Sequence, residues 1–117
     1  MVDERLERLL HRFAAAASLH AAAVEAMDEE GARHHAAIVQ RLYGEIVRCG
    51  AEGREELVLL AERGGGPVAG MAAVYSLRHA PERCVPVLRR LAGEPGLLGF
   101  RASVALDRWE RGEWELE

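Results

Sequence analysis

The sequence predicts an all-α fold, in which a long antiparallel helical hairpin is followed by two further helix pairs stacked as a short α-solenoid. Apolar residues recur at three- and four-residue steps along most of the chain, the period of an amphipathic helix. Half of the residues are hydrophobic but only 5% are aromatic, and much of the apolar content is Ala, the strongest helix former. No segment shows the two-residue alternation that is typical of a strand.

In residues 1–50 we predict two long amphipathic helices. The first begins at Asp3, whose carboxylate can cap the helix N-terminus, and ends at Met27. A short acidic turn follows, in which Asp28 is the expected N-cap of the second helix. The second helix ends at Gly50, a residue suited to the left-handed conformation that stops helices. Because the connection is so short, the two helices must pack antiparallel.

Residues 51–112 contain shorter helices separated by Gly and Pro. The predicted sequence of elements is a helix over 54–63, a break at 64–66, a helix over 68–77, a turn at 82–84, a helix over 85–91, a break at 93–96 and a last helix that ends near Gly112. In the last helix, the residues expected to face inward are Phe100, Val104, Ala105, Leu106 and Trp109.

An internal repeat is visible in this half, and it reflects either stacked helix pairs or a chance coincidence of two similar helical hairpins. Leu60 and Leu88 are 28 residues apart, and so are Pro67 and Pro95, at matching places in the two pairs. At 117 residues the chain is near the commonest size of one domain. We therefore expect a single domain over 1–117, with the hairpin in 1–50, the helix pairs in 51–112 and an acidic tail in 113–117.

Charge and cysteine content limit the classes of partner and compartment. The net charge is −4, and neither half of the chain shows a basic stripe, which argues against nucleic acid as the partner. No apolar run has the length of a membrane span, and the charged first turns do not resemble a signal peptide. Cys49 and Cys84 are the only cysteines, so we expect a cytoplasmic protein with both thiols reduced.

Three runs in the second half, Ala72 to Leu77, Ala80 to Leu88 and Pro95 to Phe100, are followed by Trp109. In this pattern the chain resembles a small bacterial family of HEAT-like helical proteins, catalogued as domain of unknown function two-thousand-nineteen. The resemblance implies HEAT-like helix pairs, and it implies no catalytic residue and no cofactor. The chain departs from the family at Gly66-Pro67, where the family carries Asp-Pro followed by an Arg.

The histidines and cysteines do not form a recognisable catalytic or metal-binding set. His34 and His35 are adjacent and so point about 100° apart on a helix, and the remaining histidines are scattered, whereas zinc sites need closely spaced ligands. We therefore expect polar surface histidines, no metal and no cofactor. Cys84 follows Arg83, which could activate its thiol, but a buried and inert cysteine is the simpler expectation.

The later helices carry the residues that we expect to bind a partner. Tyr75, Arg78 and His79 on the fourth helix, with Arg101 and Arg108 on the sixth, would line a shared groove if the second helix of each pair faces inward. The alternative is that Tyr75 packs in the core and that the arginines are solvated or pair with Glu82, Glu94 and Glu110.

Trp114 lies beyond Gly112 in the acidic tail. It either folds back as a cap on the last helix or contacts a partner, because an exposed indole is unusual without a use.

The leading hypothesis is a non-enzymatic protein-protein interaction module that binds another protein. Its most specific form is a bacterial immunity or regulatory partner that occludes a toxin or a regulator. The alternative is a small helical enzyme or ligand-binding protein that uses His34, His35 or His79 as acid or base. The expected oligomeric state is a monomer, or a weak homodimer formed through the Ala-rich face of the first helix.

Overall fold

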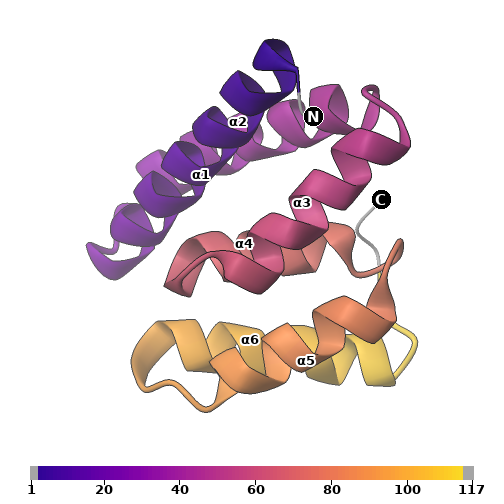
Figure 1. The fold of residues 1–117 in the computed structure, drawn as a ribbon. Helices are drawn as coiled ribbons and strands as arrows, with labels where there is room; N and C mark the ends of the chain where they lie inside the picture. Colours follow the sequence, from indigo (N-terminus) through magenta and orange to yellow (C-terminus); the bar gives the residue numbers. More distant parts are fainter. Residues whose placement is uncertain (1–2, 115–117) are drawn as a thin grey trace. The chain divides into compact units, whose positions relative to one another are not determined.

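The computed structural model describes residues 3–114, and these residues form six helices and no strand. The helices follow one another along the chain in Figure 1: α1 (Glu4–Glu25), α2 (Glu29–Val47), α3 (Ala51–Arg63), α4 (Gly66–Ser76), α5 (Pro81–Ala92) and α6 (Gly96–Glu110). The all-α prediction is confirmed. The chain divides into two compact units, one up to Leu57 and one from Val58 onward, so the division falls within α3.

The first unit contains the predicted hairpin, in which α1 packs against α2. Both predicted N-caps are present, because the Leu6 N–H donates to Asp3 Oδ1 at 2.8 Å and the Gly31 N–H donates to Asp28 Oδ1 at 2.9 Å. Asp28 also helps to end α1, since its own N–H donates to the Ala23 carbonyl at 2.9 Å. Asp28 therefore takes part in both the end of α1 and the start of α2, so the turn between the two helices is short.

Large side chains of α2 fill the core of the hairpin against a mixed face of α1. The buried residues are Leu6, Leu9, Phe13, Ala16, Ala17, His20 and Ala23 on α1, and Val39, Leu42, Tyr43 and Ile46 on α2. His20 was expected on the polar surface with the other histidines, and it is buried instead. The reason is its position, because it lies seven residues after Phe13 and so shares the inward side of α1 with that ring.

In the second unit α5 packs against both α4 and α6. The neighbours of α5 present small buried residues, namely Ala69, Ala72, Ala73 and Ser76 on α4 and Gly99, Ala102 and Ala105 on α6. The α5 helix supplies larger ones, Cys84, Val87, Leu88 and Leu91. Small faces allow close helix approach. In addition, Gly99 is required by the turn before α6, because a Cβ there would collide with the Glu94 carbonyl.

An ion pair ties α3 to α5 within the second unit. Arg83 donates through both Nε and Nη2 to the Glu62 carboxylate, at 3.1 and 2.8 Å. This hydrogen bond holds the pKa of Glu62 below its usual value, against the smaller effect of desolvation. The bidentate geometry fixes the first turn of α5 beside the last turn of α3.

Several predicted boundaries in this half are wrong. Helix α3 begins at Ala51 and not at 54, and helix α4 begins at Gly66, inside the break expected at 64–66. Helix α5 begins at Pro81, so the turn expected at 82–84 is its first turn. Proline is favourable at a helix start because its fixed φ suits the helix and its missing N–H would have no partner there. Helix α4 ends at Ser76, so Arg78 and His79 lie in the turn that follows.

The predicted inward face of the last helix is also partly wrong. Phe100 is 65% exposed and Val104 is 37% exposed, although both were expected in the core. The small residues Gly99, Ala102 and Ala105 occupy the buried side instead, which turns Phe100 and Val104 outward. Among the helices of residues 3–114, none is both long enough and apolar enough to cross a bilayer.

Candidate protein-binding surface

Three large apolar side chains lie exposed on one face of α6. Leu97 is 39% exposed, Phe100 is 65% exposed and Val104 is 37% exposed. They are three and four residues apart, so at about 100° per residue they fall within a sector of about 60°. An exposed apolar row of this kind, bordered by polar residues, is typical of interaction sites.

A basic edge runs along one side of this row. Arg101 and Arg108 lie within about 40° of the direction of Leu97, because they follow it by four and eleven residues. Both side chains are exposed. Neither guanidinium group forms an ion pair or a hydrogen bond with any residue between 3 and 114. We call Leu97, Phe100, Arg101, Val104 and Arg108 the α6 outer face.

The opposite edge of α6 carries acidic residues that are already paired. Asp107 lies 3.3 Å from Arg111, and Glu110 lies 3.9 Å from Arg89 of α5. These pairs are solvent-exposed, so each contributes little to folding stability. They nevertheless neutralise the acidic edge, and the unmatched charge of the α6 outer face is therefore positive.

The basic edge lies on the side of α6 that faces α4. Leu98 marks this side, because a Cβ at Gly70 of α4 would lie 3.7 Å from Leu98 Cδ1. Arg101 follows Leu98 by three residues and so lies about 60° around the helix from it. The acidic edge instead faces α5, as the ion pair between Arg89 and Glu110 shows.

Three of the predicted binding residues lie near the end of α4. Tyr75 is half-buried in the last turn of α4, while Arg78 and His79 are exposed in the turn before α5. The His79 N–H donates to the Ser76 carbonyl at 3.0 Å, which holds this turn against the helix end. The structure thus brings Arg101 and Arg108 together with an apolar row, and it places Tyr75, Arg78 and His79 on a different element.

Trp114 folds back toward α6. Its ring lies edge-on to Trp109, with centroids 6.1 Å apart and planes at 83°. Gly112 has φ 74°, and the Glu113 N–H donates to the Arg108 carbonyl at 2.8 Å, so the chain reverses directly after the helix. Trp114 is half-buried, with its Nε1 covered. Glu115 and Glu117, also assigned to the acidic tail, lie outside the described residues.

The histidines proposed as acid or base are divided between the two units. His34 and His35 meet edge-on in the first unit, with ring centroids 5.1 Å apart, and His34 is exposed. His79 is in the second unit. Within residues 3–114, no three His, Cys, Asp or Glu side chains come together as metal ligands would.

The two cysteines have different surroundings. Cys84 is fully buried, and this desolvation raises the pKa of its thiol to about 11, against the smaller opposing effect of Arg83. Such a thiol carries almost no thiolate at neutral pH, so it is a poor nucleophile. Cys49 is half-buried, and its Sγ lies 3.6 Å from the Glu45 carbonyl.

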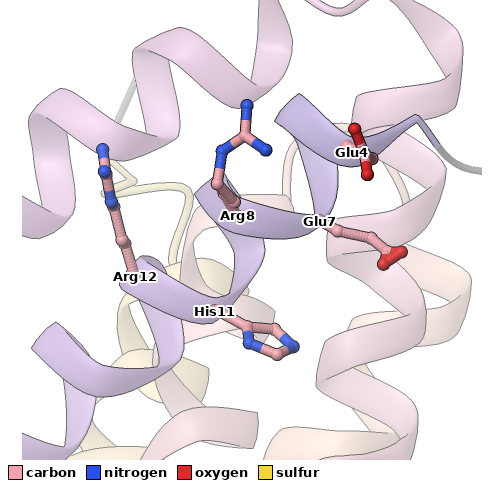
Figure 2. Close-up of a pocket in the computed structure, with 5 residues that line it drawn as sticks. All are labelled: Glu4, Glu7, Arg8, His11 and Arg12. Atoms are coloured by element: carbon pink, nitrogen blue, oxygen red, sulfur yellow. The ribbon is translucent and has the colours of Figure 1, made fainter.

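A shallow surface pocket of about 400 Å³ lies along the first turns of α1. Its lining consists of Glu4, Glu7, Arg8, His11 and Arg12, all exposed residues of one helix. In Figure 2, Arg8 and Arg12 extend to one side of the helix and Glu7 and His11 to the other. The polar groups diverge, whereas small-molecule sites have convergent polar groups in an apolar setting.

Comparison with known proteins found no family model, no curated protein and no solved structure that matches this chain.

Proposed function

We propose that this protein is a non-enzymatic interaction module that binds another protein through the α6 outer face. The observation that carries the proposal is the coincidence of the exposed row Leu97, Phe100 and Val104 with the cations Arg101 and Arg108, which form no ion pair within residues 3–114. Aromatic side chains, Phe included, and arginine are enriched in protein interfaces relative to the rest of the surface. Phe100 is the expected anchor, because it is the most exposed of the three apolar side chains.

In its most specific form, the proposal is that the chain is an immunity or regulatory partner that occludes another bacterial protein. This form predicts a complex of fixed stoichiometry, because an occluding protein must cover its target one to one. A gene for a toxin or a secreted protein next to the gene for this chain would support it.

Affinity capture from the source organism with matched variants tests the proposal. The test variants are Phe100→Ala and Arg101→Glu on the α6 outer face. The controls are Leu19→Ala and Arg41→Glu on the first unit, because Leu19 is 53% exposed and Arg41 is exposed without an ion pair within the described chain.

We expect a stable protein captured by the wild type and by both controls. Each α6 variant should weaken its binding at least about tenfold, as truncation of an anchor residue does. Capture that is equal for all four variants would contradict the assignment of the binding face, and the absence of any stable protein partner would contradict the proposed function.

A further inference from the structure

We infer that the partner presents an acidic amphipathic helix to the α6 outer face, with apolar residues against Leu97, Phe100 and Val104 and carboxylates against Arg101 and Arg108. The inference rests on the proposed function and adds the chemistry of the partner.

The dimensions of the apolar row suit a single helix. Leu97 and Val104 are seven residues apart, which is about 10 Å, or two turns, along α6. The row has the spacing i, i+3 and i+7, the pattern by which helices present their apolar side to one another. A partner helix of similar pattern can therefore bury all three side chains at once.

The charge of the surface determines the charge of the partner. On the acidic edge, Asp107 and Glu110 are already paired with Arg111 and Arg89. On the basic edge, Arg101 and Arg108 have no carboxylate within the described chain, although the chain carries a net charge of −4. A partner that carries carboxylates can pair with these two exposed cations, and complementary charges raise both the association rate and the specificity.

A second copy of this chain fits the surface less well. In an antiparallel pairing of two α6 helices, the basic edge of one copy would face the basic edge of the other, and like charges across an interface oppose binding. A parallel pairing would place the basic edge against carboxylates that are already paired.

An anionic membrane also fits less well. A helix that lies on a bilayer has cations along both borders of a long apolar face. Here the apolar row covers two turns, and one of its borders is acidic.

The test uses three synthetic 18-residue helical peptides with the same leucine pattern and with Glu, Gln or Lys at the flanking positions. Binding to the full-length protein is followed by NMR shifts of the α6 amides and by the fluorescence of Trp109 and Trp114. The Glu peptide should shift α6 resonances and bind at least tenfold more tightly than the Gln peptide. The Lys peptide should not bind. Added salt should lower the affinity of the Glu peptide for the protein.

Matched variants localise the interaction. The affinity for the Glu peptide should fall at least tenfold in Phe100→Ala and in the double variant Arg101→Glu with Arg108→Glu. It should not change in the controls Leu19→Ala and Arg41→Glu. Two further measurements test the other occupants. Sedimentation with phosphatidylserine vesicles tests binding to a membrane, and the mass of the protein alone at increasing concentration tests self-association.

Several results would overturn the inference. They are equal binding of the Glu and Gln peptides, shifts outside α6, vesicle binding that depends on Phe100, or a dimer that Phe100→Ala dissociates. If a natural partner needs the α6 outer face but the Glu peptide has no advantage, the inference fails and the proposed function stands. If variants of the α6 outer face do not change binding of the natural partner, both the inference and the proposed function fail.

Discussion

Met27 holds a backbone conformation that residues with a side chain rarely adopt. Its φ is 57°, at the position directly after the cap of α1 where Gly is usual. The Met27 N–H donates to the Val24 carbonyl at 3.1 Å, so the conformation is part of the helix stop. The side chain is 88% exposed and adds little packing in return.

Met27→Gly should therefore stabilise the first unit. The left-handed conformation costs a non-glycine residue about 1–2 kcal/mol, while a new Gly costs about 0.5–1 kcal/mol through the flexibility of the unfolded chain. The expected net gain is about 0.5–1 kcal/mol in the free energy of unfolding, measured by urea denaturation.

The reverse change provides the control for Met27→Gly. Gly50 has φ 78° with open space around it, so Gly50→Ala should destabilise by about 1 kcal/mol through strain alone. A loss of stability in Met27→Gly would show that the Met27 side chain makes contacts that outweigh the strain.

Cys84 makes folding stability sensitive to alkaline pH. The folded protein keeps the thiol protonated up to about pH 11, whereas the unfolded chain loses this proton near pH 9.0, where an unperturbed cysteine titrates. Between these values the unfolded state binds fewer protons, so stability is complete below about pH 9 and declines as the pH rises. Two pKa units correspond to a loss of roughly 2–3 kcal/mol by pH 11.

Urea denaturation at a series of pH values checks this prediction, with Cys84→Ala as the control. The variant retains all other titrating groups, so the difference between the two pH profiles isolates the thiol. Parallel profiles from pH 8 to 11 would show that the thiol of Cys84 does not have a raised pKa.

At the scale of helices, the chain relies on side-chain caps where the hairpin turns. Asp28→Ala removes the acceptor for the Gly31 N–H and should cost about 1 kcal/mol, while Asp28→Asn should cost much less because its amide oxygen can accept the same hydrogen bond. Thermal melting followed by circular dichroism measures both changes. Equal losses in the two variants would show that the charge of Asp28, and not its capping hydrogen bond, is what matters.

The caps were predictable from the sequence because they depend on residues three apart in the chain. The inward face of α6 was not, because it depends on which neighbour the helix meets. Phe100 and Val104 fit a helical apolar stripe as well as Ala102 and Ala105 do. The deciding factor is close packing with α4 and α5, which favours the small residues. The three-residue spacing of the small residues Gly99, Ala102 and Ala105 was the sequence feature that could have predicted the buried side of α6.

At the scale of the whole chain, the sequence predicted six helices and the hairpin correctly, since periodicity and helix breakers are local. The candidate surface was predicted only in part. Arg101 and Arg108 were among the residues expected to bind a partner, which stays a prediction, whereas Phe100 and Val104 were wrongly assigned to the core. Pairing of Arg89 with Glu110 and of Asp107 with Arg111 could not be foreseen either, because several exposed carboxylates were equally available to each arginine.

The role of Trp114 can be tested through stability and binding together. Edge-to-face aromatic contacts contribute about 0.5–1.5 kcal/mol beyond the area that they bury, so Trp114→Ala should lower the free energy of unfolding by roughly 1–2 kcal/mol. The fluorescence of Trp109, then the only tryptophan, should shift to the red as its ring becomes solvated.

Gly112→Ala should produce a smaller loss of stability in the same direction as Trp114→Ala, because it strains the reversal that returns Trp114 to Trp109. If Trp114 is a cap, neither variant should change the affinity for a partner that binds the α6 outer face. If Trp114 instead belongs to the binding surface, Trp114→Ala should lower the affinity for that partner and leave the free energy of unfolding unchanged. The two measurements therefore assign the side chain to the fold or to the interface.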